Sequence, residues 1–502
     1  MNQNEEKAGR SEATIFLTLP SSRTADLDAA SDIPLPSMST THETAYPIDE
    51  HEKSPAYRAA GHLAAEGMFS EHQELRQDLQ MRHVQMIALA GTIGTGLFLS
   101  SGQAVAQSGP LGALLGYLVI GLTACSVTFA NAEMGALVPL SGGSVRYAEH
   151  FVDPALAFAN GWNLVYSCLV GLPAGLVAAA VLLLVITCGG GPNGDRIGFR
   201  YWRDPGPLVQ YLGMEGSLGR FLGVWTALSQ AVYAYSGIEG ITMAAAETKS
   251  PRQAIPHAAK RILIRVFGTA STSPFVLAAK RAGITGVPSL INAVILTSAW
   301  SAGNSQMLSA TRVLYGLAID GRAPQIFTRL NRFAIPWVAV ALYGLFMCLG
   351  YMSLSDGASV AFRWLQNLVA ISTLVNWLTI CTTYLRFYYG MKKQGIPRSA
   401  LPWAAPFQPY MTWISGALFS LILITGGYAT FLRGNWSTET FVSSYLNIPL
   451  FAILYLGYKF VKKTKMVALE DIPIRGFMAV AEAHPEEKLA PNAGLRRLNI
   501  LW

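Results

Sequence analysis

Glycine interrupts two long apolar stretches of this sequence, and one of the two also carries an acidic residue. Residues 91–96 read G-T-I-G-T-G, and residues 235–240 read Y-S-G-I-E-G. Each glycine costs a helix roughly 1 kcal/mol relative to alanine, and a backbone group released from a helix inside a bilayer needs another partner. The two segments therefore predict broken helices that present polar backbone groups at membrane depth.

A break of this kind predicts a binding site. The N–H groups at a helix N-terminus favour a carboxylate, and two glycine-interrupted spans in separate halves of a chain indicate a transporter site. Glu239 adds a titratable carboxyl group within an apolar run, where a charge is costly enough to indicate a function. Two other interpretations stay open: close helix packing through the small residues of 91–96, and a protonated Glu239 bonded to a neighbouring helix.

The composition indicates a protein surrounded by lipid. Hydrophobic residues make up 51% of the 502 residues and charged residues 13%, against roughly 25% charged residues in soluble domains. Nine apolar runs have about the length that crosses a bilayer, and they are 84–103, 110–130, 154–187, 220–246, 287–319, 336–354, 360–385, 412–432 and 441–460. The sequence predicts an all-α membrane protein, a multi-span helical bundle over 84–462, with a disordered cytosolic tail at 1–83 and a cytosolic tail at 463–502.

Charge and motif content exclude several classes of function. The net charge of +7 comes from basic clusters beside the apolar runs, which is typical of the cytoplasmic loops of a membrane protein rather than of a nucleic-acid binder. The five cysteines form no C-x-x-C pair, and the sequence contains no zinc-protease, nucleophile-elbow or phosphate-loop motif. We therefore expect no enzyme activity, metal site, cofactor or nucleic-acid partner.

The basic clusters also reveal a conflict in topology. The clusters at 249–261 and 322–332 should both be cytoplasmic, but only the run 287–319 lies between them. One crossing cannot return the chain to the same side. We therefore predict that residues 262–279 cross the membrane or enter it as a re-entrant segment.

The order of several motifs resembles the fungal amino-acid permeases of the amino acid–polyamine–organocation superfamily. Residues 79–96 resemble the first span of that family, and further matches follow in order at 133–134, 141–143, 151–156, 161–163, 199–202, 204–206, 235–239, 288–293 and 301–305. The resemblance covers about residues 75–474. It implies a twelve-helix fold with an inverted five-plus-five repeat, cytoplasmic termini and proton-coupled amino-acid uptake (symport), which we expect at the plasma membrane.

The resemblance also implies roles for individual residues. The backbone of Gly94, Thr95 and Gly96 would receive the substrate carboxylate. The substrate ammonium would meet carbonyl groups near Thr92, Ile93 and Ser236, with Ile238 and Glu239 close by. Glu239 would carry the coupled proton, because it is the titratable group of this site.

Two segments of the family pattern have no counterpart here. After residue 180 the chain runs directly to the glycines at 189–191, and after residue 265 it runs directly to 273–276. The first gap corresponds to family span four and most of span five, and the second to span seven, so the fold is expected to be an incomplete version of the family's. Two alternatives to transport follow: a degenerate or mis-spliced permease that inserts without transporting, and an amino-acid sensor.

Overall fold

The computed structural model describes residues 81–138, 143–187, 206–242, 250–269, 287–332, 335–350, 358–432 and 434–483. For residues 81–102, 176–187, 241, 261–269, 287–302 and 358–362 it describes the backbone alone. All of these residues belong to the compact unit Ser54–Trp502. The expected disordered tail falls outside the described residues, apart from its last three positions, which already belong to the first helix.

Every regular element in the described ranges is a helix, as the composition predicts. The longer ones are α2 (Met81–Leu137), α4 (Pro154–Thr187), α6 (Gly216–Ala234), α7 (Pro251–Thr269), α9 (Val287–Ile319), α10 (Trp337–Met347), α11 (Ala358–Lys393), α12 (Tyr410–Thr425) and α14 (Asn447–Lys462). Shorter ones are α3 (Ser144–Phe151), η2 (Ile238–Thr242), α13 (Thr438–Tyr445) and α15 (Ile474–Ala483). Each of the nine apolar runs lies at least largely in one or two of these helices.

The first two apolar runs both lie in α2, and the helical conformation is interrupted between them. The bend between them is at Gly109, which has φ +78°. There the chain pairs with the segment before α6, because the Leu111 amide donates to the Pro207 carbonyl at 3.0 Å and the Val209 amide donates to the Ser108 carbonyl at 3.2 Å. A side chain at 109 would meet the Pro207 carbonyl oxygen at 2.6 Å. Glycine is therefore required for this close approach.

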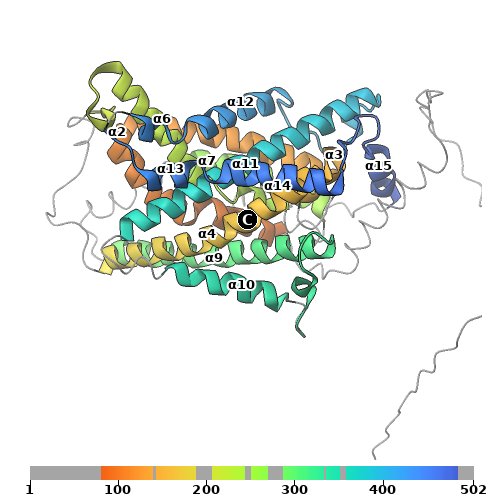
Figure 1. The fold of residues 1–502 in the computed structure, drawn as a ribbon, viewed down its shortest axis with the longest axis horizontal. Helices are drawn as coiled ribbons and strands as arrows, with labels where there is room; N and C mark the ends of the chain where they lie inside the picture. Colours follow the sequence, from red (N-terminus) through yellow and green to blue (C-terminus); the bar gives the residue numbers. More distant parts are fainter. Residues whose placement is uncertain are drawn as a thin grey trace, which may run out of the picture. The chain divides into compact units, whose positions relative to one another are not determined.

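The helices pack in two groups (Figure 1). In the first group, α2 packs along α6, α7 and η2. In the second group, α4 packs against α3, α9, α10, α11 and α14. Helices α9 and α4 also contact α2, α11 contacts α2 and α6, and α12 lies on both α11 and α2, so the two groups share an extensive interface.

Lipid-facing surface is concentrated on the outer helices. Five helices with described side chains are long and apolar enough to cross a membrane. In the most apolar part of each, 72% of the residues are buried in α2 but only 17% in the span that includes α14. On α14, Ile453 and Phe460 are exposed by 67% and 76%. Apolar side chains exposed to this extent along a helix require an apolar solvent. The structure and the composition agree on an integral membrane protein.

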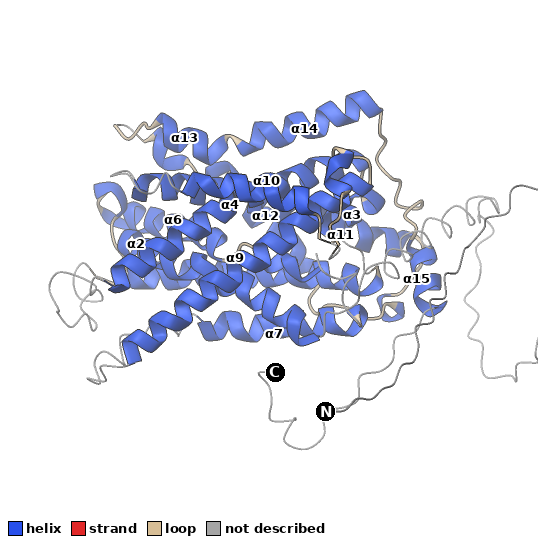
Figure 2. Cartoon of the chain, turned by 90° about the horizontal axis from the view of Figure 1, so that it is seen from below, coloured by secondary structure: helices blue, strands red, loops and turns tan. Residues whose placement is uncertain are grey.

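The C-terminal segment folds back onto one end of the bundle, beside α3 (Figure 2). Helix α15 buries Ile474, Phe477 and Val480, and the guanidinium of Arg252 in α7 donates to the Ala481 carbonyl at 2.5 Å. Before α15, the amide of Gln394 donates to the carbonyl oxygen of Ile472 at 2.8 Å. Residues 463–483 are thus a docked segment, and the rest of the predicted C-terminal tail lies outside the described residues.

The re-entrant segment predicted at 262–279 is described only in part. Residues up to Thr269 continue α7 as a helix, and 270–286 lie outside the described residues. The prediction that this segment crosses or enters the membrane therefore stays a prediction.

Candidate functional site

The second glycine-interrupted segment is broken, as predicted. Helix α6 ends at Ala234, and Gly237 takes φ +94°, a conformation that favours glycine. The chain then makes the single 3-10 turn η2, in which the Gly240 amide donates to the Gly237 carbonyl at 3.0 Å. The hydroxyl of Ser236 donates to the Tyr233 carbonyl at 2.8 Å and so satisfies one acceptor at the helix end. The break places Ile238 and Glu239 in the interior.

The prediction of a break at 91–96 is wrong for this structure. Residues 91–96 lie inside α2 and are helical throughout. A continuous helix satisfies its backbone groups internally, which is the lowest-cost solution in lipid, and the propensity cost of three glycines is smaller than the cost of unpaired amides. The small residues at 91–96 are therefore compatible with the alternative of helix packing.

Glu239 is held at the junction between the two groups of helices. Its side chain is 8% exposed, and the indole N–H of Trp377 in α11 donates to Oε2 at 3.2 Å. Asn376, the residue before Trp377 in α11, is also buried, and its side-chain nitrogen has no hydrogen-bond partner among the described residues. The carboxyl group therefore lies in the break that follows α6, in the first group of helices, and is contacted by α11 of the second group.

Buried amides extend this polar centre to two further helices. Asn131 of α2 donates to the Thr242 hydroxyl at 2.6 Å, and that hydroxyl donates to the Glu239 carbonyl at 3.2 Å. The side-chain amide of Asn160 in α4 donates to the side-chain oxygen Oδ1 of Asn376 at 3.1 Å. The Oδ1 atoms of Asn131 and Asn160 are buried without a hydrogen-bond partner among the described residues, so they can accept further hydrogen bonds from a ligand or water.

Sequence reasoning missed the three asparagines of this centre. Asn131, Asn160 and Asn376 are all 0% exposed. The signal was present, because each asparagine lies in or just after an apolar run, where polar side chains are costly unless they are bonded. Asn131 reaches Thr242 and Asn160 reaches Asn376 through helix packing, which the sequence does not display.

A second charged cluster ties α3 to the end of α9. Arg322 pairs with Glu149, and the guanidinium of Arg146 lies 3.2 Å from the Asp320 carboxylate. Burial, together with the positive charges of Arg146 and Arg322, lowers the pKa of the neighbouring His150 to about 3. This cluster is a structural clamp between helices, and within the described residues no group of three His, Cys, Asp or Glu side chains could hold a metal ion.

Comparison with known proteins explains the architecture. The family model described as "Amino acid permease" matches residues 83–184, 176–270 and 266–470. The chain belongs to the amino acid permease family. It is 30% identical over 518 residues to the dicarboxylic amino acid permease of Saccharomyces cerevisiae, with 86% of this chain and 85% of that protein covered. It is 34% identical over 478 residues to the proline-specific permease of Emericella nidulans, with 78% of this chain and 86% of that protein covered. The chain is therefore a membrane permease for amino acids and not an enzyme.

The match of this permease to its family model falls into three pieces. Their junctions lie at 176–184 and 266–270, the two places where the sequence departs from the family pattern. The absence of span four, most of span five, and span seven stays a prediction. The residues that form the break and carry Glu239 lie inside the middle piece.

Proposed function

We propose that this permease takes up α-amino acids together with protons, with Glu239 as the coupling group, at the plasma membrane. The observation that carries the proposal is a buried carboxyl group inside a helix break that the opposite group of helices contacts through Trp377. A carboxyl group at such a junction changes its environment when the two groups move, and a change of environment changes its proton affinity. Proton binding and helix movement are then linked.

Substrate binding would use the backbone around the break and the turn of α2 at residues 91–96. Carbonyl groups near Ser236 and Ile238 would accept from the ammonium, together with those of Thr92 and Ile93. The carboxylate would bind the amides of Gly94, Thr95 and Gly96. Because those amides lie inside a helix here, binding requires that turn of α2 to open, and its glycines reduce the cost of opening.

Uptake assays with Glu239→Gln test the proposal. Cells lacking their own amino-acid uptake would express the wild type, Glu239→Gln and the control Glu439→Gln, which removes an exposed carboxylate on α13. Uptake of a panel of labelled L-amino acids would be measured between about pH 4.5 and 7.5. We expect wild type and control to show uptake that rises as the outer pH falls, and Glu239→Gln to lose that dependence.

Two outcomes contradict the proposal. Equal, non-zero uptake with the same pH dependence in Glu239→Gln and wild type excludes Glu239 as the coupling group. No uptake of any amino acid by correctly inserted wild type supports the second candidate, a permease that inserts without transporting. The observation behind that second candidate is the division of the family match at 176–184 and 266–270.

A further inference from the structure

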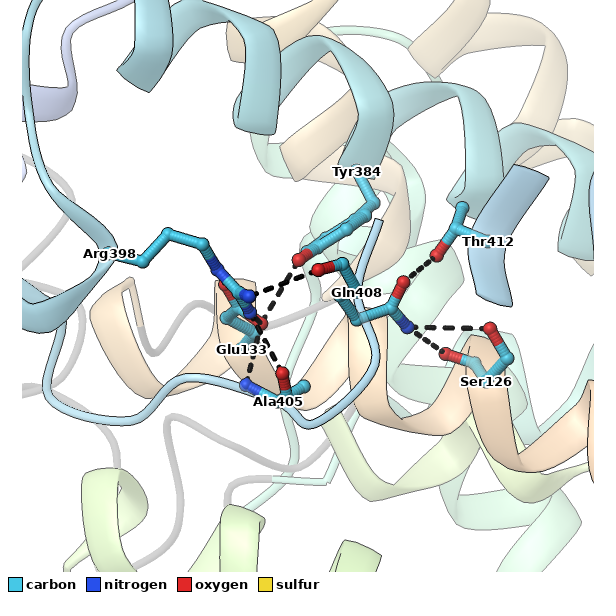
Figure 3. A network of polar contacts seen from close by, with 7 residues as sticks. All are labelled: Ser126, Glu133, Tyr384, Arg398, Ala405, Gln408 and Thr412. Carbon is cyan, nitrogen blue, oxygen red and sulfur yellow. Dashed lines mark hydrogen bonds and ion pairs between the residues drawn. The ribbon is translucent and has the colours of Figure 1, made fainter. Parts of the chain in front are cut away.

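Glu133 of α2 is a fully buried carboxylate with four donors around it (Figure 3). The guanidinium of Arg398 donates to both carboxylate oxygens, from Nε at 3.3 Å and from Nη2 at 2.8 Å. The Tyr384 hydroxyl donates to Oε2 at 3.1 Å, and the Ala405 amide donates to the same atom at 2.8 Å. Four donors and a paired charge are what a carboxylate needs to remain ionised in the interior.

Arg398 also holds the conformation of its own segment, residues 394–409. It lies between α11 and α12, and its guanidinium donates to the carbonyl oxygens of Ala405 at 2.9 Å and Gln408 at 3.1 Å. Gln408 in turn donates to the hydroxyl of Ser126 on α2 at 3.3 Å. The segment 394–409 is therefore fastened to α2 at Glu133 and Ser126, two helical turns apart.

The contact joins the two groups of helices at one end of the bundle. Glu133 belongs to α2 and so to the first group, whereas Tyr384 lies on α11, and Arg398 and Ala405 follow it. Lys392 and Lys393 close α11 at this end, which the excess of basic residues assigns to the cytoplasm. The Arg398 side chain is 28% exposed, so water can reach the pair from the cytoplasmic side.

We propose that Glu133, Tyr384, Arg398 and Ala405 form a cytoplasmic latch that opens during each transport cycle. The latch rests on the proposed transport function. Closed, it holds 394–409 against the end of α2 and shuts the pathway from the cytoplasm. Open, it releases Glu133 to water and lets the first group separate from α11. A pair of this kind has two defined states, because a half-separated buried charge is unfavourable.

Cysteine labelling at position 126 tests the latch. Ser126 is 1% exposed and lies under Gln408, so a cysteine there reacts when 394–409 lifts. The variant Ser126→Cys, in a background with Cys125→Ala, would be treated with a maleimide in inside-out membrane vesicles and quantified by peptide mass spectrometry. We expect Glu133→Gln to be labelled about tenfold faster, the change that follows from losing one charge-assisted hydrogen bond.

Two further variants, one that weakens the contact in part and one control, distinguish a latch from a purely structural contact. Tyr384→Phe removes one of the four donors and keeps the ion pair, so an intermediate rate is expected. The control Lys459→Gln breaks another pair with a buried carboxylate, Asp153, at 2.6 Å. That pair joins α14 to the start of α4 within the second group, so we expect lower thermal stability with no change in labelling at 126.

Labelling also separates this proposal from the proposed function. If the protein transports, a saturating mixture of the L-amino acids of the uptake assay should accelerate maleimide labelling at position 126. If the protein inserts without transporting, the amino acids should leave the labelling rate unchanged. The faster labelling caused by Glu133→Gln is expected in both cases. A folded Glu133→Gln variant labelled at the wild-type rate overturns the latch. Equal acceleration by Lys459→Gln also overturns it, because the effect is then general loosening of the fold.

Discussion

Gly143 lies outside the candidate site, but a substitution there would displace part of that site. It precedes α3 with φ +42° and ψ −110°, and a Cβ there would lie 2.7 Å from the Thr242 hydroxyl and 3.0 Å from the Thr242 carbonyl oxygen. Thr242 is bonded to the Glu239 carbonyl and to Asn131. The substitution Gly143→Ala must therefore shift the turn that carries Glu239.

The expected cost has two parts. The backbone strain of a non-glycine residue in this conformation is about 1–3 kcal/mol. The contact requires the Thr242 backbone to retreat by a few tenths of an ångström, and because misplacement of about 1 Å can cost a hundredfold in a positioned site, we expect uptake to fall by roughly tenfold. Thermal unfolding in detergent would report the stability, and initial uptake rates per inserted molecule would report the function.

Gly321→Ala is the matched control. Gly321 has φ +69° but no atom within 4 Å of the position of its Cβ, so alanine there adds backbone strain of about 1–2 kcal/mol without pressing on a neighbour. We expect a stability loss with unchanged uptake per inserted molecule. The reasoning is refuted if Gly143→Ala transports as well as Gly321→Ala, because the position of Thr242 would then not matter to the site.

Two further predictions concern other buried contacts. The folded protein holds the pKa of His150 at about 3, against an ordinary value of 6.5. As the pH falls below 6.5, the unfolded chain therefore binds a proton at this histidine before the folded protein does. We expect the wild type to lose up to about 2 kcal/mol of stability between pH 7.5 and 5 relative to His150→Leu. That figure is an upper limit, since the ring is partly exposed, and parallel melting curves for the two proteins over this range would contradict it. Trp377→Phe keeps the packing on Phe419, whose ring centroid is 5.0 Å away, and removes the hydrogen-bond donor to Glu239. We expect the free energy of unfolding to fall by about 0.5–1.5 kcal/mol and uptake to fall several-fold. Uptake at the wild-type rate would show that this hydrogen bond is dispensable.

The sequence was sufficient for the helices and for one of the two breaks. Apolar runs near 20 residues leave no other structure for a backbone in lipid, and α9 begins and ends where its run does. Gly237 and Gly240 marked the break beside Glu239. The same reasoning failed at 91–96, because glycine lowers helix propensity without requiring a break, and a bilayer favours the continuous helix.

What the sequence determined by itself was the class of the molecule: an all-helical membrane protein with a carboxyl group in an interrupted helix, resembling the amino-acid permeases. The helical class and the interrupted helix follow from local composition and spacing, and the resemblance follows from the order of several motifs. Only the tertiary structure showed that Trp377 meets Glu239 from α11, and that Arg398 reaches Glu133 across 265 positions of the chain. Such pairs depend on the angle and register at which distant helices pack, and many sequences of the same hydrophobic pattern satisfy that packing in different ways.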